Sequence, residues 1–335
     1  NRLEWAEVQA SIASVLAEAR RYEEVVELSQ AVLPEIRELK AFRYEAELLN
    51  DTCVSLRNLG RLDEAEGHAV RLGEIGAMVS SHRDQADSTA HLLAIAIKRN
   101  QFDRALELSE QRHRTLVALG DQDGASRMLI NKAENLAALG QIVEADAFLS
   151  RTALPAVREH SGPYWEAYGL AIRSALRASQ GAYESSTEDC HAAAAIFRSS
   201  GRTRLEAFAQ ILCGASLISL ERYDEALLYL GKSRKMREDA GLEVLLAQND
   251  LVEGQRWLAM KRLDEAEARG RSALERWRDT DLAFDRATAH EFLSRVLLEA
   301  GRLDEARAEL AKAKAIGAGA DREFALALEL ADFRF

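Results

Sequence analysis

The sequence predicts an all-α protein, built as an α-solenoid of about eight antiparallel helix pairs. One supporting observation is a motif, GRLDEA, which occupies residues 60–65 of the 335-residue chain and returns at 301–306. A second is the helical spacing of apolar residues ahead of each copy, as in Leu48, Leu49 and Leu56. A third is the presence of only three prolines, where average usage of about 5% would give roughly 17. The residue that most strongly interrupts helices is therefore scarce.

One large apolar residue in each copy of the motif allows the copies to be aligned. These anchors are Tyr22, Leu62, Phe102, Ile142, Tyr183, Tyr223, Leu263 and Leu303. Their spacing is 40 residues throughout, except for 41 between Ile142 and Tyr183. Mostly small residues lie nine positions before and three positions after the anchors, such as Gly254 and Ala266 around Leu263. Small side chains at matched positions let two helices approach closely, so each copy is interpreted as a packed helix pair.

The boundaries within each copy follow from glycine and acidic residues. Gly60, Gly140, Gly181 and Gly301, with Asn100 in another copy, are expected to end the first helix in the left-handed conformation. Acidic residues just after most anchors are expected to begin the second helix, cap its free amides and suit its dipole. Each unit then consists of a helix, a tight turn, a helix and a longer turn.

We expect one solenoid rather than two domains, because a single helix pair cannot bury its apolar stripe without neighbours. The predicted units are approximately 1–42, 43–82, 83–122, 123–162, 163–202, 203–242, 243–282 and 283–320, followed by a terminal helix at 321–335.

The order of small residue, apolar anchor, two acids and small residue resembles the tetratricopeptide repeat (TPR). The resemblance covers nearly the whole chain and implies a right-handed superhelix with a concave groove lined by the first helices. The period of 40 exceeds the usual 34, and the usual proline after the second helix is missing. Longer helices or loops must absorb about six residues per unit. This longer form is similar to the arrays of bacterial MalT-like regulators and of the scaffold that links G-protein subunits to spindle proteins.

No pattern in the sequence indicates catalysis, a cofactor or a metal. The seven histidines form no HExxH and no i,i+4 pair, and neither a phosphate-binding loop nor GxSxG is present. The recurring Asp-Glu pairs follow the structural period, so we interpret them as helix starts. The chain is therefore not expected to be an enzyme or to hold a cofactor.

Composition indicates the compartment and excludes two classes of partner. Cys53, Cys190 and Cys213 form no CxxC and are too few for a disulfide framework, which favours a reducing, cytoplasmic setting. A net charge of −11 disfavours direct nucleic-acid binding. The apolar runs fall short of the roughly 18 residues that a membrane span needs.

The remaining candidate site is the groove. The resemblance places groove-facing residues 15, 12, 8 and 5 positions before each anchor, where small and apolar residues in the middle could accept an amphipathic helix or an extended peptide. Arg57, Arg127 and Arg295, with Lys98, could hold acidic groups. The alternative is that these residues pack against neighbouring helices. The candidates for partner binding are Asn50, Arg57, Lys98, Arg127, Glu134, Tyr168, Ala175, Phe208, Ile211, Gln248, Gln255 and Arg295.

The leading functional hypothesis is a non-catalytic scaffold or sensor that binds a protein or peptide. It would be a module of a larger bacterial-type signalling or regulatory protein with a flanking effector domain, because the chain begins at Asn1 rather than Met. One alternative is an oligosaccharide sensor of a MalT-like transcriptional regulator, with aromatic platforms among Tyr164, Trp165, Tyr168, Trp257 and Trp277. Another is an accessory region of an enzyme whose catalytic domain lies elsewhere.

Overall fold

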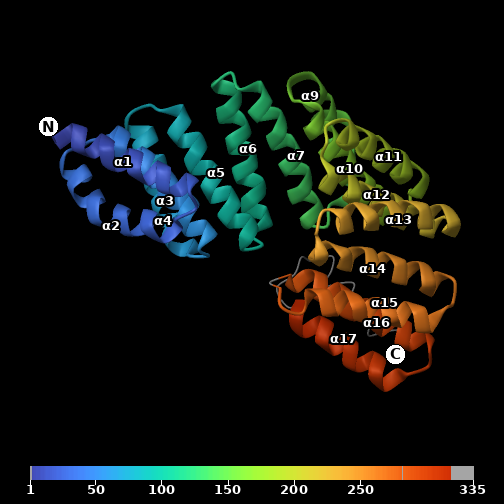
Figure 1. Ribbon diagram of the computed structural model, residues 1–335. Helices are drawn as coiled ribbons and strands as arrows, with labels where there is room; N and C mark the ends of the chain where they lie inside the picture. Colours follow the sequence, from blue (N-terminus) through green and yellow to red (C-terminus); the bar gives the residue numbers. More distant parts are fainter. Residues whose placement is uncertain (1, 281, 318–335) are drawn as a thin grey trace. The chain divides into compact units, whose positions relative to one another are not determined.

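The computed structural model describes residues 2–280 and 282–317, and over these residues it contains helices and no strands. The prediction of an all-α fold of paired helices is confirmed (Figure 1). In chain order the helices are α1 (Arg2–Glu18) and α2 (Tyr22–Glu38); α3 (Phe42–Asn58) and α4 (Leu62–Met78); α5 (His82–Lys98) and α6 (Phe102–Ala118); α7 (Gln122–Ala138), then α8 (Ile142–Phe148), η1 (Leu149–Ala153) and α9 (Leu154–His160) without a break; α10 (Pro163–Ser179) and α11 (Tyr183–Ser199); α12 (Thr203–Ser219) and α13 (Tyr223–Asp239); α14 (Glu243–Ala259) and α15 (Leu263–Trp277); and α16 (Ala283–Glu299) and α17 (Leu303–Gly317). The terminal helix expected at 321–335 lies outside the described residues.

The chain forms two compact units, Asn1–Asn135 and Leu136–Phe335, called here the N-terminal unit and the C-terminal unit. One continuous solenoid over residues 1–335 stays a prediction.

The 40-residue period comes from the lengths of the helices. Most helices have 17 residues and most turns have three, so a half-repeat has 20 residues and a repeat has twice that number. All eight second helices begin at the anchor residues. Compared with a 34-residue repeat, the additional residues therefore lie mainly in longer helices.

The turns share one hydrogen-bonded motif. After α3, Gly60 has φ of 76° and the Arg61 N–H donates to the Leu56 carbonyl at 2.9 Å. This is the pairing by which a left-handed residue satisfies the carbonyls at a helix end. After α2, Lys40 has φ of 49° and the Ala41 N–H donates to the Ile36 carbonyl at 3.2 Å. The expected longer turn between units is therefore wrong in most repeats, because both junctions use the same three-residue turn.

The residue with positive φ in each turn should affect the free energy of unfolding. Glycine occupies this position in seven turns, but Glu221 occupies it after α12 with φ of 59°. A side chain in this conformation costs about 1 kcal/mol relative to glycine. We expect Glu221→Gly to raise the free energy of unfolding by about 0.5–1 kcal/mol and Gly181→Ala to lower it by a similar amount, measured by urea unfolding. A fall in the free energy of unfolding with Glu221→Gly, together with a rise with Gly181→Ala, would contradict this account of the turns.

The single 41-residue spacing corresponds to a π-helical turn. The second helix of that repeat runs from Ile142 to His160, and η1 (Leu149–Ala153) lies in its middle. An inserted residue widens one helical turn in this way. Leu149 and Ala153 stay fully buried there, so the helix keeps its buried face despite the insertion.

The small residues at matched positions perform the expected role. Gly214 on α12 faces Leu230 on α13 so closely that a Cβ on the glycine would lie 2.7 Å from Leu230 Cδ2. Gly254 on α14 has the same relation to the ring of Phe292 on α16, at 2.8 Å. The prediction that small side chains permit close helix approach is confirmed at these two contacts.

The acidic residues of the second helices lie in the first turn, where they were predicted, and several of them also pair with an arginine. The residue preceding the anchor makes no side-chain capping hydrogen bond in α2, α4, α13 or α15. Instead the arginine at that position pairs with the glutamate three residues later, as in Arg222–Glu225 and Arg302–Glu305, both at 2.6 Å. These pairs are exposed, so each contributes at most about 1 kcal/mol.

Two of the three cysteines form a disulfide, a pairing that the sequence did not predict. Cys190 on α11 is bonded to Cys213 on α12, and both are fully buried. Cys53 is free and buried. The disulfide joins the second helix of one repeat to the first helix of the next.

Candidate functional site

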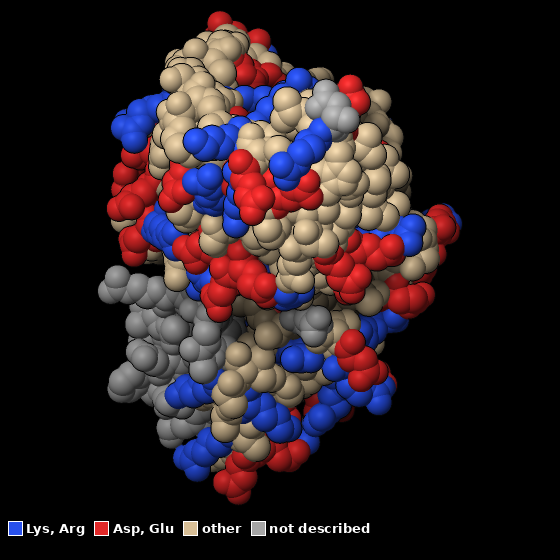
Figure 2. Space-filling model, turned by 90° about the vertical axis from the view of Figure 1, so that its left-hand side faces the viewer, with Lys and Arg blue, Asp and Glu red and all other residues tan. Residues whose placement is uncertain are grey.

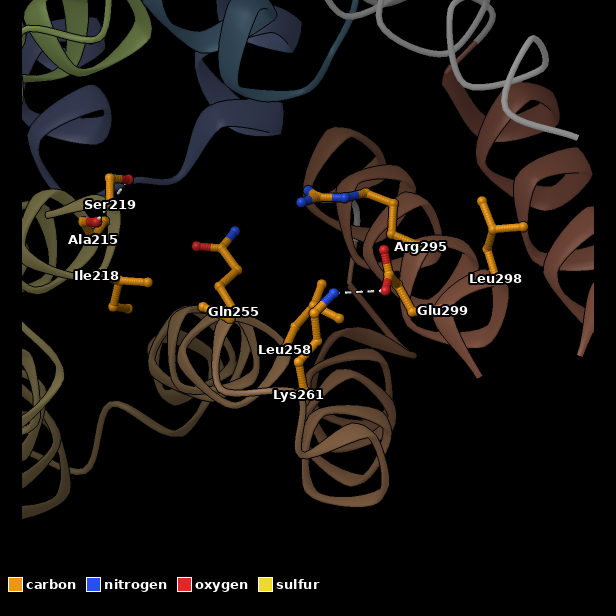
Figure 3. A pocket seen from close by; sticks show the side chains of 10 residues that line it. Ala215, Ile218, Ser219, Gln255, Leu258, Lys261, Arg295, Leu298 and Glu299 are labelled. Atoms are coloured by element: carbon orange, nitrogen blue, oxygen red, sulfur yellow. Dashed lines mark hydrogen bonds and ion pairs between the residues drawn. The ribbon is translucent and has the colours of Figure 1, made fainter. Parts of the chain in front are cut away.

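The C-terminal unit contains a hollow of about 650 Å³ formed by α12, α14 and α16, called here the C-terminal hollow (Figure 3). One position of each repeat supplies Ala215, Gln255 and Arg295, eight residues before the anchors. A second position supplies Ile218, Leu258 and Leu298, five residues before the anchors. Residues three apart on a helix share a face, so the repeat presents both rows on the same side.

The floor of the hollow is continuous with the core. Ile218 and Leu258 are only 8% and 9% exposed, and each belongs to a core cluster of its own helices. Ala215 has a minimal side chain, which leaves the space open at that end. The apolar row is therefore held rigidly by packing beneath it.

Two polar groups that line the hollow have no partner at hydrogen-bond distance among the described residues. The Gln255 amide makes no hydrogen bond within the described residues, and the nearest carboxylate to Arg295 is Glu291 Oε2, 3.8 Å from Nη1. Figure 3 shows both side chains directed into the space. By contrast, Lys261 Nζ donates to Glu299 Oε2 at 2.7 Å, which holds the pKa of that carboxyl below its ordinary value.

Sequence reasoning missed four of the residues that line this hollow. Ser219, Ala259 and Glu299 lie four positions before their anchors, and Lys261 lies in the turn after α14. The available signal was helix geometry, because a residue next to a groove-facing position lines the edge of the same face.

In the N-terminal unit, three candidates meet around a histidine that the sequence did not single out. Arg57 Nη1 donates to His91 Nδ1 at 3.0 Å, so the ring carries its proton on Nε2 and donates it to Asn50 Oδ1 at 2.9 Å. Lys98 Nζ donates to the Arg57 carbonyl at 2.6 Å. These groups bond to one another within the protein, although the buried Nε of Arg57 has no hydrogen-bond partner among the described residues.

Burial, and secondarily the positive charges of Arg57 and Arg112, lower the pKa of His91 to about 4 from 6.5. The unfolded chain therefore takes up a proton here between pH 6.5 and about 4 while the folded chain does not. The contribution of a neutral His91 is complete above pH 6.5 and is lost as the pH falls.

We expect this uptake to remove about 2 kcal/mol of stability between pH 7 and pH 5, since one pKa unit corresponds to about 1.4 kcal/mol. His91→Gln should lose that part of the pH dependence in urea unfolding, while His82→Gln at the exposed start of α5 should retain it. Identical pH profiles for the two variants would contradict the assignment.

Asn50 also lines a second hollow of about 550 Å³ between α3, the end of α4 and the start of α5. Its wall contains Phe42 and Ala46 together with Glu47 and Asp87. Burial raises the pKa of Asp87 above its ordinary value.

The other candidate residues are distributed over several environments. Tyr168 stacks on Tyr164 with centroids 6.3 Å apart, and Gln248 accepts from the buried Arg237 at 3.0 Å. Ile211 is 5% exposed within a core cluster, so the alternative of packing describes it better than partner contact. The remaining placements are Ala175 and Phe208, exposed on α10 and α12; Arg127, paired with Asp123 at 2.6 Å; and Glu134, half-buried on α7.

Of the five aromatic residues considered as sugar platforms, Trp277 is buried and the other four are partly exposed. Trp277 is 1% exposed and lies in the core. Trp257 has Arg256 and Arg262 over its ring, at 4.6 and 4.5 Å from the centroid. Trp165 and Tyr168 contact each other edge to face.

Three further features of the described residues bear on partner class. No group of three or more metal-ligating side chains is close enough to hold an ion. None of the helices in this part of the chain is long and apolar enough to cross a bilayer. On the face drawn in Figure 2, acidic and basic side chains are interspersed.

Paired helices in a regular repeat, with small residues at the crossings, define a TPR-like helical-repeat fold. The sequence matches no protein-family model and no curated protein.

Solved structures share this fold at low sequence identity. The apo quorum sensor NprR from B. thuringiensis is similar with a TM-score of 0.71 and 12% identity, over 93% of this chain and 87% of that one. Aspartyl phosphate phosphatase F from Bacillus subtilis gives 0.70 and 16%, over 86% and 75%. A signal transduction ATPase with a tetratricopeptide repeat sensor from Pyrococcus horikoshii gives 0.57 and 16%, over 90% of this chain and 50% of that one.

Proposed function

We propose that the chain is a non-catalytic sensor or scaffold module that binds a peptide segment of a partner in the C-terminal hollow. The observation that carries this proposal is the hollow itself, with an apolar row beside Gln255 and Arg295. Binding sites commonly combine a mostly apolar lining with a few polar groups that fix orientation. A sensor role is supported by two similar structures, one a quorum sensor and the other a signal transduction ATPase with a tetratricopeptide repeat sensor.

In this proposal the module belongs to a larger bacterial-type signalling or regulatory protein, and the repeats form one solenoid. Its partner is a protein or peptide, without direct nucleic-acid or membrane binding. The proposal includes a cytoplasmic location. The Cys190–Cys213 disulfide weighs against that location, because disulfides persist mainly in oxidising compartments.

The test is selection of a displayed library of random nonapeptides on the immobilised full chain. Ala215→Arg would fill the open end of the hollow, so we expect selected peptides to bind this variant at least tenfold more weakly. Leu228→Arg, on α13 and 63% exposed, is the matched control and should bind as the wild type does. Equal binding by all three chains would place the site elsewhere. Thermal unfolding should show that both variants fold.

A second candidate is an oligosaccharide sensor of a MalT-like regulator, favoured by the similarity to the ATPase with a tetratricopeptide repeat sensor. The burial of Trp277, and the two arginines that lie over the Trp257 ring, weigh against it. A rise in melting temperature with maltooligosaccharides, and none with peptides, would favour this candidate. If the chain is an accessory region of an enzyme, a longer chain that includes the catalytic domain should turn over a substrate, and these 335 residues alone should not.

A further inference from the structure

We infer that the C-terminal hollow recognises an acidic–aliphatic peptide segment, in which an Asp or Glu carboxylate pairs with Arg295 and a neighbouring aliphatic side chain packs on Leu258. This inference rests on the proposed function and names the chemistry of its ligand.

The charges in the hollow favour an anion. Its lining contains two cations, Lys261 and Arg295, and one carboxylate, Glu299. Lys261 is paired with Glu299 at 2.7 Å, so the guanidinium is the charge without a counterion at hydrogen-bond distance among the lining residues. A carboxylate can accept two parallel hydrogen bonds from a guanidinium, and this geometry suits arginine better than lysine.

The arginine is in a position to accept a new partner. Its side chain is 43% exposed, and Glu291 lies 3.8 Å away on the same helix. In the same unit, Arg276 and Arg302 bind carboxylates at 2.6 and 2.5 Å, which leaves them little capacity for a ligand. Figure 3 shows the Arg295 guanidinium reaching over the space on the side of Gln255.

The apolar row sets the second requirement. Ile218, Leu258 and Leu298 occupy equivalent positions on α12, α14 and α16 and line the same hollow. An aliphatic side chain laid on this row would remove apolar surface from water at about 25 cal/mol per Å². In the row eight positions before the anchors, Gln255 lies between Ala215 and Arg295. Its side-chain amide can bond to the backbone of a peptide, which carries both a donor and an acceptor at most residues.

The order of residues along the repeats also gives the segment a direction. The row eight positions before the anchors changes from Ala215 to Gln255 to Arg295, that is from small to polar to cationic. The carboxylate therefore belongs at the α16 end of the segment, and a small or aliphatic residue belongs at the α12 end.

The experiment repeats the nonapeptide selection on the full wild-type chain and on Arg295→Glu. We expect wild-type selections to be enriched in Asp or Glu near Leu, Ile, Val or Met. The Arg295→Glu chain should lose the acidic residue and gain Lys or Arg. Arg307→Glu, on α17 and 58% exposed, is the matched charge control and should keep the wild-type preference.

Affinity then tests the pair directly. Replacing the selected acid by its amide should weaken wild-type binding by roughly 10- to 100-fold, as expected for a charge-assisted hydrogen bond. The same replacement should change binding to Arg295→Gln less than about threefold. Glu291→Gln should strengthen binding of the acidic peptide, because it removes the nearest competing carboxylate.

The outcomes separate this inference from the function on which it rests. Selection of purely apolar peptides that Ala215→Arg still blocks would overturn the acidic requirement and leave peptide binding intact. Acidic peptides that bind Arg295→Glu as well as the wild type would also overturn it. Failure of the wild type to select any peptide sensitive to Ala215→Arg would overturn the proposed function itself.

Discussion

Phe292→Ala is expected to lower the free energy of unfolding by about 3–5 kcal/mol, the range found when a buried aromatic side chain is truncated. Phe292 is 1% exposed on α16, and its ring lies against the bare backbone of Gly254 on α14 and Gly270 on α15. Without the ring, neither glycine supplies atoms to fill the cavity. Phe284→Ala, on the same helix but 50% exposed, should cost less than about 1 kcal/mol in the same urea titration.

A double substitution isolates the contact between ring and glycine. Gly254→Ala alone should destabilise the protein, because its Cβ would lie 2.8 Å from Phe292 Cζ. In a Phe292→Leu background the same change should cost less, since the ring edge is gone. Strict additivity of the two substitutions would show that the close approach has no energetic consequence.

Asp250→Ala is expected to cost about 3 kcal/mol at pH 7. The carboxylate is fully buried on α14 and accepts four hydrogen bonds, from Arg234 (2.7 Å), Arg269 (3.1 Å), Arg276 (2.9 Å) and Ser272 (2.8 Å). Removing one member of a buried ionic group leaves the others uncompensated, at a cost of about 3–5 kcal/mol. The lower figure applies because these arginines are 20–40% exposed and can regain water.

The effect of Asp250 should depend on pH. Burial alone would raise the pKa of Asp250, but the bonds from Arg234, Ser272 and Arg276 hold it below 3.8. Its contribution is therefore complete above that pH and disappears as the pH falls through the lowered folded-state pKa. Urea unfolding of wild type and variant should converge in strong acid. Asp264→Ala, exposed in the first turn of α15, should stay near the wild type at every pH.

The sequence allowed the paired helices and the start of each second helix to be predicted, because three independent signals recur at one period. Anchors such as Leu263 begin helices, and left-handed residues such as Gly181 end them. Small residues such as Gly254 mark the crossings. A mistake in one repeat is corrected by the other seven.

Features without a periodic signal were missed. The Cys190–Cys213 pair depends on a contact between α11 and α12 that occurs in one place, and sequence spacing cannot reveal it. The π-helical turn had a signal in the 41-residue spacing, but a loop insertion would have produced the same number. Arg222 and its equivalents were assigned no role, although each pairs with a glutamate in the first turn of its helix.

The sequence predicted which positions line the candidate site. It did not predict which of their polar side chains bond to neighbouring residues instead of facing the hollow. The positions of Gln255 and Arg295 follow from the repeat, and both line the hollow. Gln248 and Asn50 follow from the same rule, yet each accepts a hydrogen bond from a neighbouring side chain, Arg237 or His91. Such bonds depend on which residues lie on adjacent helices. Comparing one position across the repeats does not give that information.

The three-residue turns that join most of the helices have a consequence for how such a chain can change in length. Since α1 to α2 and α2 to α3 are joined in the same way, a block of forty residues can be duplicated or excised within a unit wherever both of its ends fall at turns of this kind. A block of twenty would also leave sound turns, but every later helix would then run in the opposite direction. Viable length variants should therefore differ by whole multiples of forty residues.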